Sequence, residues 1–272
     1  MQSARRIAVT GATGRVGRHV VDVLEAQGHD VVRISRSDGV DVVTGEGLAQ
    51  ALAGVERVVD AATQPLNDYD AATAFFTSST RNLLEIGREA GVQQIVVVSI
   101  VGADRFTGSF LAASAAHERA LAAGPIPVRI LRATQFHEFV PQMVEWGRQG
   151  DVVYVPRIRT QPVAVRSVGE ALAGLAAVPD LELGDDIASI PEVGGPREEW
   201  LVEIVSRLVS RRGESLRVEE VSDPADPDHE LLENGALLPG PDATLAGPTF
   251  EEWLDAEGIV DVPLRAGRSS VE

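Results

Sequence analysis

The sequence predicts an α/β fold in which a doubly wound parallel sheet is covered by helices on both faces. Three observations support this prediction. Apolar runs rich in Val and Ile recur along the first 150 residues, amphipathic Ala-rich segments separate them, and a glycine-rich turn directly follows the first run. Strands that are continuously apolar are buried on both faces, as in a parallel sheet between two helical layers.

The elements of the first 150 residues follow each other in a regular order. Strands are expected at 6–10, 30–34, 57–62, 94–99 and 127–132, with a weaker one at 40–43. Helices are expected between them, at 15–27, 45–53, 70–90 and 110–123. Because the crossover between parallel strands is right-handed, this alternation predicts a series of right-handed βαβ units.

The alternation becomes less regular after residue 150. Helices are expected at 167–177, 197–211 and 249–256, and strands at 185–190 and 215–221. A stretch rich in Pro, Asp and Gly covers 222–248, and its acidic part at 223–230 is typical of a surface loop. The chain therefore divides into a core at 1–150 and a smaller α/β portion at 151–272.

The composition excludes several kinds of partner and chemistry. The 272 residues include 24 basic and 41 acidic side chains, a formal net charge of −17, so nucleic acid and anionic membranes are unfavourable partners. The chain has no cysteine, which excludes thiol nucleophiles and cysteine-ligated metals and fits a reducing, cytoplasmic location. All basic residues are arginine, so lysine chemistry is excluded. No metal site, signal peptide or membrane span is expected, and the oligomeric state stays open.

The turn after the first strand carries the strongest local signal. Gly11, Gly14 and Gly17 stand in G-x-x-G-x-x-G spacing between a strand and a helix. Gly11 permits a tight turn, Gly14 lets the backbone approach a pyrophosphate, and Gly17 lets the helix pack on the strand. The helix N-terminus adds free N–H groups and the positive end of the helix dipole. The sequence therefore predicts a Rossmann-type dinucleotide site, with a purely structural turn as the alternative.

The end of the second strand distinguishes NADP(H) from NAD(H). NAD sites typically place an Asp or Glu there to bind the ribose 2′-hydroxyl. Residues 31–37 contain no acid, whereas Arg36, assisted by Ser35 and by Arg15 or Arg33, can hold a 2′-phosphate. We therefore expect NADP(H) as the cofactor. The alternative is that Arg36 is a solvated loop residue.

Five segments give the chain a resemblance to a known family. They are 10–17 (TGATGRVG), 96–104 (VVVSIVGAD), 130–139 (ILRATQFHEF), 161–172 (QPVAVRSVGEAL) and 235–254 (GALLPGPDATLAGPTFEEWL). Together they resemble the NmrA-like branch of the atypical short-chain dehydrogenase/reductases over nearly the whole chain. The resemblance implies an NADP(H)-binding Rossmann core at 1–150 and a substrate-binding portion at 151–272 that packs with it as one unit.

The same resemblance implies which residues line the cofactor. They fall into four groups, around the pyrophosphate, the 2′-phosphate, the adenine and the nicotinamide. In that order they are Gly11, Ala12, Thr13, Gly14, Arg15 and Val16; Arg36; Asp41 and Val42; and Ala61, Ala62 and Thr63, with Ser99, Ala133, Thr134, Gln135 and Phe136 completing the pocket.

The catalytic residues of the family are only partly present. Its reductases use a Ser and a Tyr-x-x-x-Lys pair, in which Tyr donates a proton and Lys lowers its pKa. Ser99 matches the Ser, but Phe110 stands at the Tyr position and Ser114 at the Lys position. Ser99 and His137 remain as candidate catalytic residues; a strand-end contact for Ser99 and a position behind the site or at the surface for His137 are the alternatives. Residues 117–118 (His-Glu) lack zinc-motif spacing and are expected on a helix face.

An aromatic stripe adds an indication of the substrate. Phe136, Phe139, Met143 and Trp146 share a helical spacing, which is typical of a core face or of the apolar wall of a pocket for an aromatic molecule. We expect an NADPH-dependent ketoreductase that acts on an aromatic polyketide or quinone-like metabolite, similar to angucyclinone ketoreductases, without the Tyr–Lys relay. The alternatives are a non-catalytic NADP(H)-sensing regulator and an NAD(P)H quinone or azo reductase.

Overall fold

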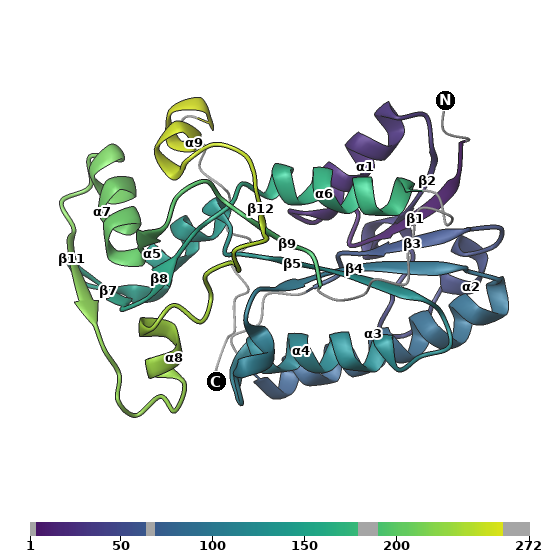
Figure 1. Ribbon diagram of the computed structural model, residues 1–272, viewed down its shortest axis with the longest axis horizontal. Helices are drawn as coiled ribbons and strands as arrows, with labels where there is room; N and C mark the ends of the chain where they lie inside the picture. The colour runs from purple at the N-terminus through teal and green to yellow at the C-terminus, as the bar shows by residue number, and fades with distance from the viewer. Residues whose placement is uncertain (1–3, 64–68, 179–189, 258–272) are drawn as a thin grey trace, which may run out of the picture.

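A seven-stranded parallel sheet forms the centre of the molecule (Figure 1). The computed structural model describes residues 4–63, 69–178 and 190–257. The strand order is β12-β9-β5-β4-β3-β1-β2, and all neighbouring pairs are parallel. The strands are β1 (Arg6–Thr10), β2 (Asp30–Ile34), β3 (Arg57–Asp60), β4 (Gln94–Ile100), β5 (Val128–Ala133), β9 (Glu192–Gly194) and β12 (Thr244–Leu245). The predicted α/β fold with a doubly wound parallel sheet is therefore confirmed.

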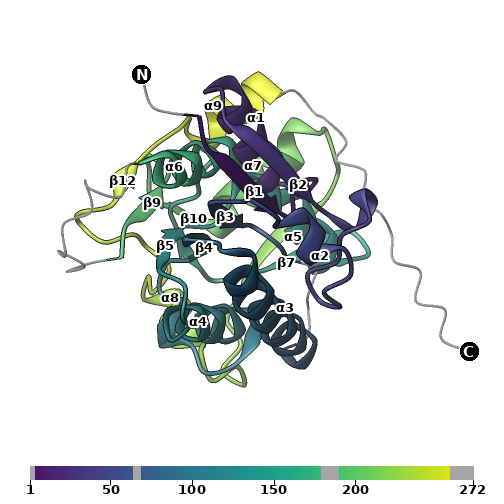
Figure 2. The same cartoon turned by 90° about the vertical axis from the view of Figure 1, so that its right-hand side faces the viewer.

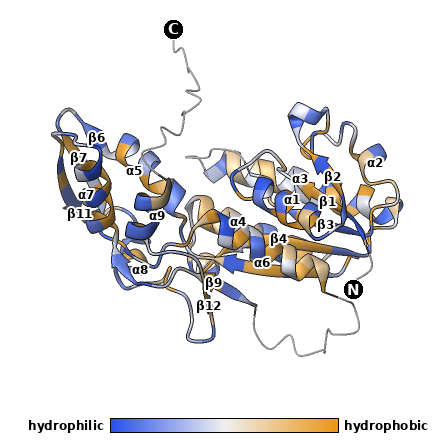
Figure 3. Ribbon diagram, turned by 90° about the horizontal axis from the view of Figure 1, so that it is seen from above, coloured by the Kyte–Doolittle hydropathy of each residue, from blue (hydrophilic) through white to orange (hydrophobic). Residues whose placement is uncertain are grey.

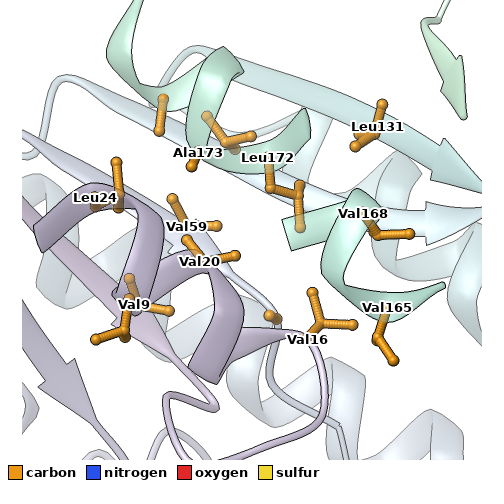
Figure 4. Packing of buried hydrophobic residues seen from close by; sticks show 14 of the residues in the cluster. Val9, Val16, Val20, Leu24, Val59, Leu131, Val165, Val168, Leu172 and Ala173 are labelled. Carbon is orange, nitrogen blue, oxygen red and sulfur yellow. The ribbon is translucent and has the colours of Figure 1, made fainter. Parts of the chain in front are cut away.

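Helices cover both faces of this sheet (Figure 2). On one face lie α1 (Gly17–Ala26) and α6 (Val165–Ala177); on the other lie α3 (Tyr69–Ala90) and α4 (Ser109–Ala122), with the short α2 (Leu48–Ala51) beside α3. Figure 4 shows Val20 and Leu24 of α1 meeting Leu172 and Ala173 of α6 above the sheet, all fully buried. Burying a Leu or Val side chain contributes about 1.5–3 kcal/mol, so this seam holds α6 onto the first half of the chain.

The second half of the chain also builds a small layer of its own. Its strands are β6 (Arg148–Gln149), β7 (Val152–Pro156) and β11 (Arg217–Val221) in one sheet and β8 (Arg159–Thr160) with β10 (Glu199–Trp200) in another. Its helices are α5 (Val140–Gly147), α7 (Leu201–Arg211), α8 (His229–Glu233) and α9 (Phe250–Glu257). A separate core that includes Val144, Val153, Ile204 and Phe250 joins α5, α7, α9 and β7.

The two portions are interleaved along the chain. Residues after 150 supply α6, β9 and β12 to the large sheet and its covering layer, in addition to the small layer. Figure 3 shows β4 as largely hydrophobic, as expected for a strand between two helical layers. The small layer is joined to the large sheet through the segment that follows β5, and this segment carries several predicted site residues.

Some expected elements differ from the structure. The weak strand at 40–43 is wrong: the Asp41 carboxylate accepts the backbone N–H of Val43 at 2.7 Å, and this turn replaces a strand. The third expected strand ends at Asp60, two residues early. The helix expected at 197–211 begins only at Leu201, because Glu199 and Trp200 pair with β8. The strand expected at 185–190 lies outside the described residues except for its last residue.

Candidate functional site

The turn after β1 has a shape that only glycine permits. Gly11 has a φ of +62°, and a Cβ there would lie 2.6 Å from the carbonyl oxygen of Ala61. A Cβ on Gly17 would lie 2.2 Å from the Gly11 carbonyl oxygen, and one on Gly14 would lie 2.9 Å from the same atom. The glycines therefore let α1 begin against the end of β1 and let the turn approach the end of β3.

This turn presents unused backbone donors. Within the described part of the chain, the N–H groups of Thr13, Arg15 and Val16 have no hydrogen-bond acceptor, whereas the N–H of Gly14 donates to Gly11. No side chain caps the N-terminus of α1, and its first turn contains no acid. Free N–H groups at the positive end of a helix dipole form an anion site, so the residues present fit a pyrophosphate.

The predicted cofactor residues come together along one edge of the sheet, the edge formed by the carboxyl ends of its strands. The chain leaves β1 toward β2 on one side and continues to β3 on the other, so the strand order reverses between β1 and β3. Dinucleotides bind outside the carboxyl ends of the strands at such a reversal. Residues 61–63, Ser99 and residues 133–136 follow or end β3, β4 and β5, and the register pairs Ser99 with Arg132. The glycine turn and the three predicted nicotinamide-side segments therefore share this edge.

The adenosine side of the edge lies beyond β2. Arg36 begins a short 3₁₀ helix (Arg36–Asp38), is exposed, and its guanidinium has no hydrogen bond or ion pair with any described residue. Arg33 is paired with Glu25 at 3.0 Å and is not available for a ligand. The hydroxyl of Ser35 donates to Asp38, an acid one turn beyond the strand. Of the predicted 2′-phosphate ligands after β2, Arg36 is therefore the free cation.

Arg15 is directed toward α5. Its guanidinium lies 4.8 Å from the centre of the Phe139 ring and donates to Oε1 of Gln142 at 3.3 Å. Burial lowers the pKa of Arg15, and the nearby Glu138 carboxylate opposes this shift. Glu138 itself accepts the backbone N–H of Val165 at the start of α6. Through these contacts the phosphate turn, α5 and α6 hold each other in place.

The relay positions of the family contain a small buried serine pair. Ser99 is 3% exposed, and its hydroxyl oxygen lies 3.2 Å from that of Ser114 on α4. Phe110, one turn earlier, packs on Phe76 with ring centres 5.7 Å apart. Both tyrosines lie on other elements, since Tyr69 begins α3 and is exposed and Tyr154 lies on β7. The hydroxyl at the predicted Ser position thus contacts the residue at the predicted lysine position.

His137 lies behind the site, where it anchors α9. The side chain has no solvent exposure, and its ring packs beside the stacked rings of Phe250 and Trp253, with ring centres 5.4 and 5.6 Å away. Nε2 donates to the carbonyl oxygen of Pro248 at 3.1 Å. Burial lowers the pKa of His137 to about 4, so the ring is neutral at pH 7. This geometry favours a structural role over proton donation.

A second buried polar cluster was missed by the sequence analysis. Asp60 ends β3 and accepts hydrogen bonds from the Thr10 hydroxyl at 2.5 Å and from His117 Nε2 at 3.1 Å. Glu118, the residue after His117 on α4, forms a two-point ion pair with Arg132 on β5 and raises the pKa of that guanidinium. Residues 117–118 do lie on a helix, but both are buried. The detectable signal was an acid directly after the apolar run of β3.

The turn after β5 holds its polar side chains by internal contacts. Gln135 accepts the Thr160 hydroxyl at 2.5 Å, and the Thr134 hydroxyl donates to the carbonyl oxygen of Gln161 at 2.6 Å. Phe136 and Phe139 stack with ring centres 5.8 Å apart. In the described ranges, no group of three or more His, Asp or Glu side chains is placed to hold a metal ion. None of the helices described is both long and apolar enough to cross a bilayer.

Comparison with known proteins identifies a family for the part of the chain that contains this turn. Residues 11–173 match the model of a family described as NAD(P)H-binding. A curated relative, the photosystem II assembly factor Ycf39 of Synechocystis sp., is 30% identical over 115 residues, which cover 37% of this chain and only 35% of that protein.

Solved structures of low sequence identity share the fold. Triphenylmethane reductase of Citrobacter sp. with NADP(H) is 17% identical over 92% of this chain and 99% of that one, with a TM-score of 0.61. An NADPH-dependent quinone oxidoreductase of Escherichia coli is 18% identical with the same coverages and a TM-score of 0.60. A GDP-6-OMe-4-keto-L-xylo-heptose reductase of C. jejuni is 14% identical over 94% and 99%, with a TM-score of 0.64.

Proposed function

Because the chain belongs to the NAD(P)H-binding family, we propose that it is an NADPH-dependent reductase that delivers hydride to a carbonyl of an aromatic polyketide or quinone-like metabolite. One observation carries the mechanistic part of this proposal. The phosphate turn is intact, while Phe110 and Ser114 replace the Tyr and Lys of the expected relay. The likeness to reductases of dyes and quinones supports this substrate class.

The phosphate turn and Arg36 bind the cofactor in this proposal. The N–H groups of Thr13, Arg15 and Val16 hold the pyrophosphate, and Arg36 holds the 2′-phosphate, because its guanidinium beside β2 pairs with none of the described residues. The nicotinamide half extends over the ends of β3, β4 and β5. When bound, NADPH supplies the hydride for the carbonyl carbon.

The apolar residues after β5 select the substrate. Phe136 and Phe139 stack on each other, and the ring of Phe139 also contacts the guanidinium of Arg15, a residue of the phosphate turn. Trp146 lies near the end of α5, seven residues after Phe139, which directly precedes that helix, and is 51% exposed. A flat aromatic ligand gains contact area against such side chains, and pockets of this kind are largely apolar.

The reduced oxygen must still receive a proton. Ser99 is buried against Ser114, and Nε2 of His137 donates its proton to the carbonyl oxygen of Pro248. Neither side chain therefore presents a free acidic proton at the carboxyl ends of the strands. We place the proton source in solvent water or in a phenol of the substrate beside its carbonyl. Holding the reactants in contact then supplies most of the rate.

The test is NADPH oxidation on a matched panel of hydroxyquinones, angucyclinone-type ketones and simple aliphatic ketones. We expect turnover of the aromatic ketones and little with aliphatic ones. Reduction of simple quinones or azo dyes alone would support the quinone or azo reductase. Tight NADP(H) binding with no turnover on the whole panel would contradict the reductase.

That last result would favour a non-catalytic NADP(H) sensor. Two observations support this alternative: the expected relay residues are absent from the sequence, and the curated relative Ycf39 is named as an assembly factor. We propose a cytoplasmic location and no nucleic-acid partner, on the absence of cysteine and the net charge of −17.

A further inference from the structure

The ends of β1 and β3 are joined by a side-chain contact at the point where the strand order reverses. Thr10 is the last residue of β1 and Asp60 the last of β3, and the two are paired in the parallel register. The hydroxyl of Thr10 donates to Asp60 Oδ1 at 2.5 Å. Thr10 directly precedes the phosphate turn, and Asp60 directly precedes the segment at 61–63, so one carboxylate lies between two cofactor-lining segments.

Hydrogen-bond donors hold both oxygens of the Asp60 carboxylate. Its side chain is 2% exposed. Oδ1 also accepts the backbone N–H of Ala62 at 3.2 Å, and Oδ2 accepts Nε2–H of His117 at 3.1 Å. The His117 ring is fixed in turn by the hydroxyl of Thr80, 2.6 Å from Nδ1, and by stacking on Phe76 at 4.7 Å. The carboxylate therefore has little freedom to move.

The Asp60 carboxylate is ionised. Burial alone would raise the pKa of Asp60, but the hydrogen bond and charge interaction with His117 and the hydrogen bonds from Thr10 and Ala62 outweigh burial and hold that pKa below its usual value. The Asp60 carboxylate is therefore a fixed negative charge between the two cofactor-lining segments.

Neighbouring cations are occupied by other acids or directed elsewhere. Arg132 on β5 is paired with Glu118 and with Asp104, and Arg15 is directed toward α5. The chain has no lysine that could take the place of the family's relay cation. The charge of Asp60 is therefore not neutralised by these groups.

The position of this charge gives it a functional consequence. At such a reversal the adenosine half of a dinucleotide lies beside β2, so the other half extends over β3 and its neighbours. The nicotinamide ring is a cation when oxidised and neutral when reduced. A fixed negative charge in a partly desolvated site attracts the cation more strongly.

We propose that Asp60 is a positioning residue for the nicotinamide half of the dinucleotide and that its buried carboxylate favours the oxidised, cationic form over the reduced form. This role of Asp60 rests on the dinucleotide site proposed above and not on the identity of the substrate. A site of this kind favours hydride donation by the bound cofactor. The charge near the nicotinamide is then negative, whereas a site that contains the relay lysine has a positive charge there.

Asp60→Asn tests the charge with little change of shape. The Asn oxygen still accepts from Thr10 and Ala62, and its NH₂ donates to His117 once that ring donates from Nδ1 to Thr80. The measurement is the dissociation constant of NADP⁺ and of NADPH, by calorimetry, for both proteins. We expect the ratio of the NADP⁺ constant to the NADPH constant to rise about three- to tenfold, the size of a partly screened interaction between unit charges.

Two further variants make the result decisive. Asp30→Asn removes an exposed carboxylate at the opposite end of the sheet and should leave the ratio unchanged. Asp60→Ser, which leaves room for water between Thr10 and Ala62, should shift the ratio like Asp60→Asn and serves if the latter fails to fold. Equal weakening of both cofactor forms in the folded variants would show a purely structural role and overturn the proposal.

The readout separates this proposal from the reductase activity. Absence of turnover on every substrate would contradict the reductase but leave the binding ratio measurable. Failure of the unmodified protein to bind either form would overturn both proposals, because the site itself would then be wrong.

Discussion

Ser99 and Ser114 place their hydroxyl oxygens 3.2 Å apart between β4 and α4, at the two positions where the resemblance to the family predicts a serine and a lysine. Two short hydroxyls fill the space without a charge. The contact is buried, so each hydroxyl satisfies the other. The pair thus leaves no buried hydroxyl without a partner at this position.

Ser99→Ala should lower stability more clearly than activity. Loss of one buried hydrogen bond costs about 0.5–1.5 kcal/mol, or a few degrees in Tm. Removing a true general acid would lower the rate by about 10²–10⁴, and we expect less than about tenfold. Thermal unfolding and kcat on the best ketone check both values. Tyr69→Phe and Tyr154→Phe are the controls and should be near neutral; loss of turnover in either would show that a tyrosine relay exists.

The glycine at the start of α1 should not tolerate a methyl group. Gly17→Ala places a Cβ 2.2 Å from the Gly11 carbonyl oxygen, so the phosphate turn must shift. We expect a loss of about 1–3 kcal/mol in the free energy of unfolding and more than tenfold weaker NADPH binding. Gly174→Ala is the matched control at an exposed position of α6, where a Cβ would meet nothing within 4 Å. It should stabilise by about 0.5–1 kcal/mol, because alanine favours a helix. Similar changes in stability and NADPH binding in the two variants would contradict this role of the phosphate turn.

The sequence predicted the core of the fold because its signals were local. Continuous apolar runs located β1, β2, β4 and β5, and the glycine spacing located the phosphate turn. The Asp60–His117 pair could not be found in this way, since 57 residues separate partners that meet only through the packing of α4 on the sheet. The turn at Asp41 was mistaken for a strand because its Val-rich composition concealed a carboxylate that binds its own backbone.

The cofactor preference should depend on Arg36. Its guanidinium is exposed and unpaired among the described residues, and it follows a strand tip without an acid. Arg36→Ala removes a charge-assisted contact worth about 1.5–3 kcal/mol, so NADPH binding should weaken by about one to two orders of magnitude. NADH binding should change little.

Arg33→Ala provides the control for this variant. Arg33 lies three residues earlier but is paired with Glu25, so its loss should affect neither cofactor strongly. Titration of both cofactors by fluorescence checks the prediction. Equal affinity of the unmodified protein for NADH and NADPH would contradict it.

The anchoring of α9 should be lost in acid through His137. Its pKa is lowered to about 4 in the folded protein, against about 6.5 in an unfolded chain, because burial disfavours the charged ring. The unfolded chain therefore binds the proton first, and stability that is present above pH 6.5 is lost as the pH falls toward 4. A shift of this size corresponds to about 3 kcal/mol. Thermal unfolding between pH 7.5 and 4 should show this decline in the unmodified protein, a range defined by the two pKa values.

His137→Gln should be less stable at pH 7.5, because the aromatic contacts with Phe250 and Trp253 are lost. Its Tm should, however, fall less steeply with acid, since the titrating ring is gone. His229→Gln, on the partly exposed α8, is the control and should keep the slope of the unmodified protein. If His137→Gln kept the full acid slope, the buried neutral imidazole would not be its source, and the carboxylates would have to account for it.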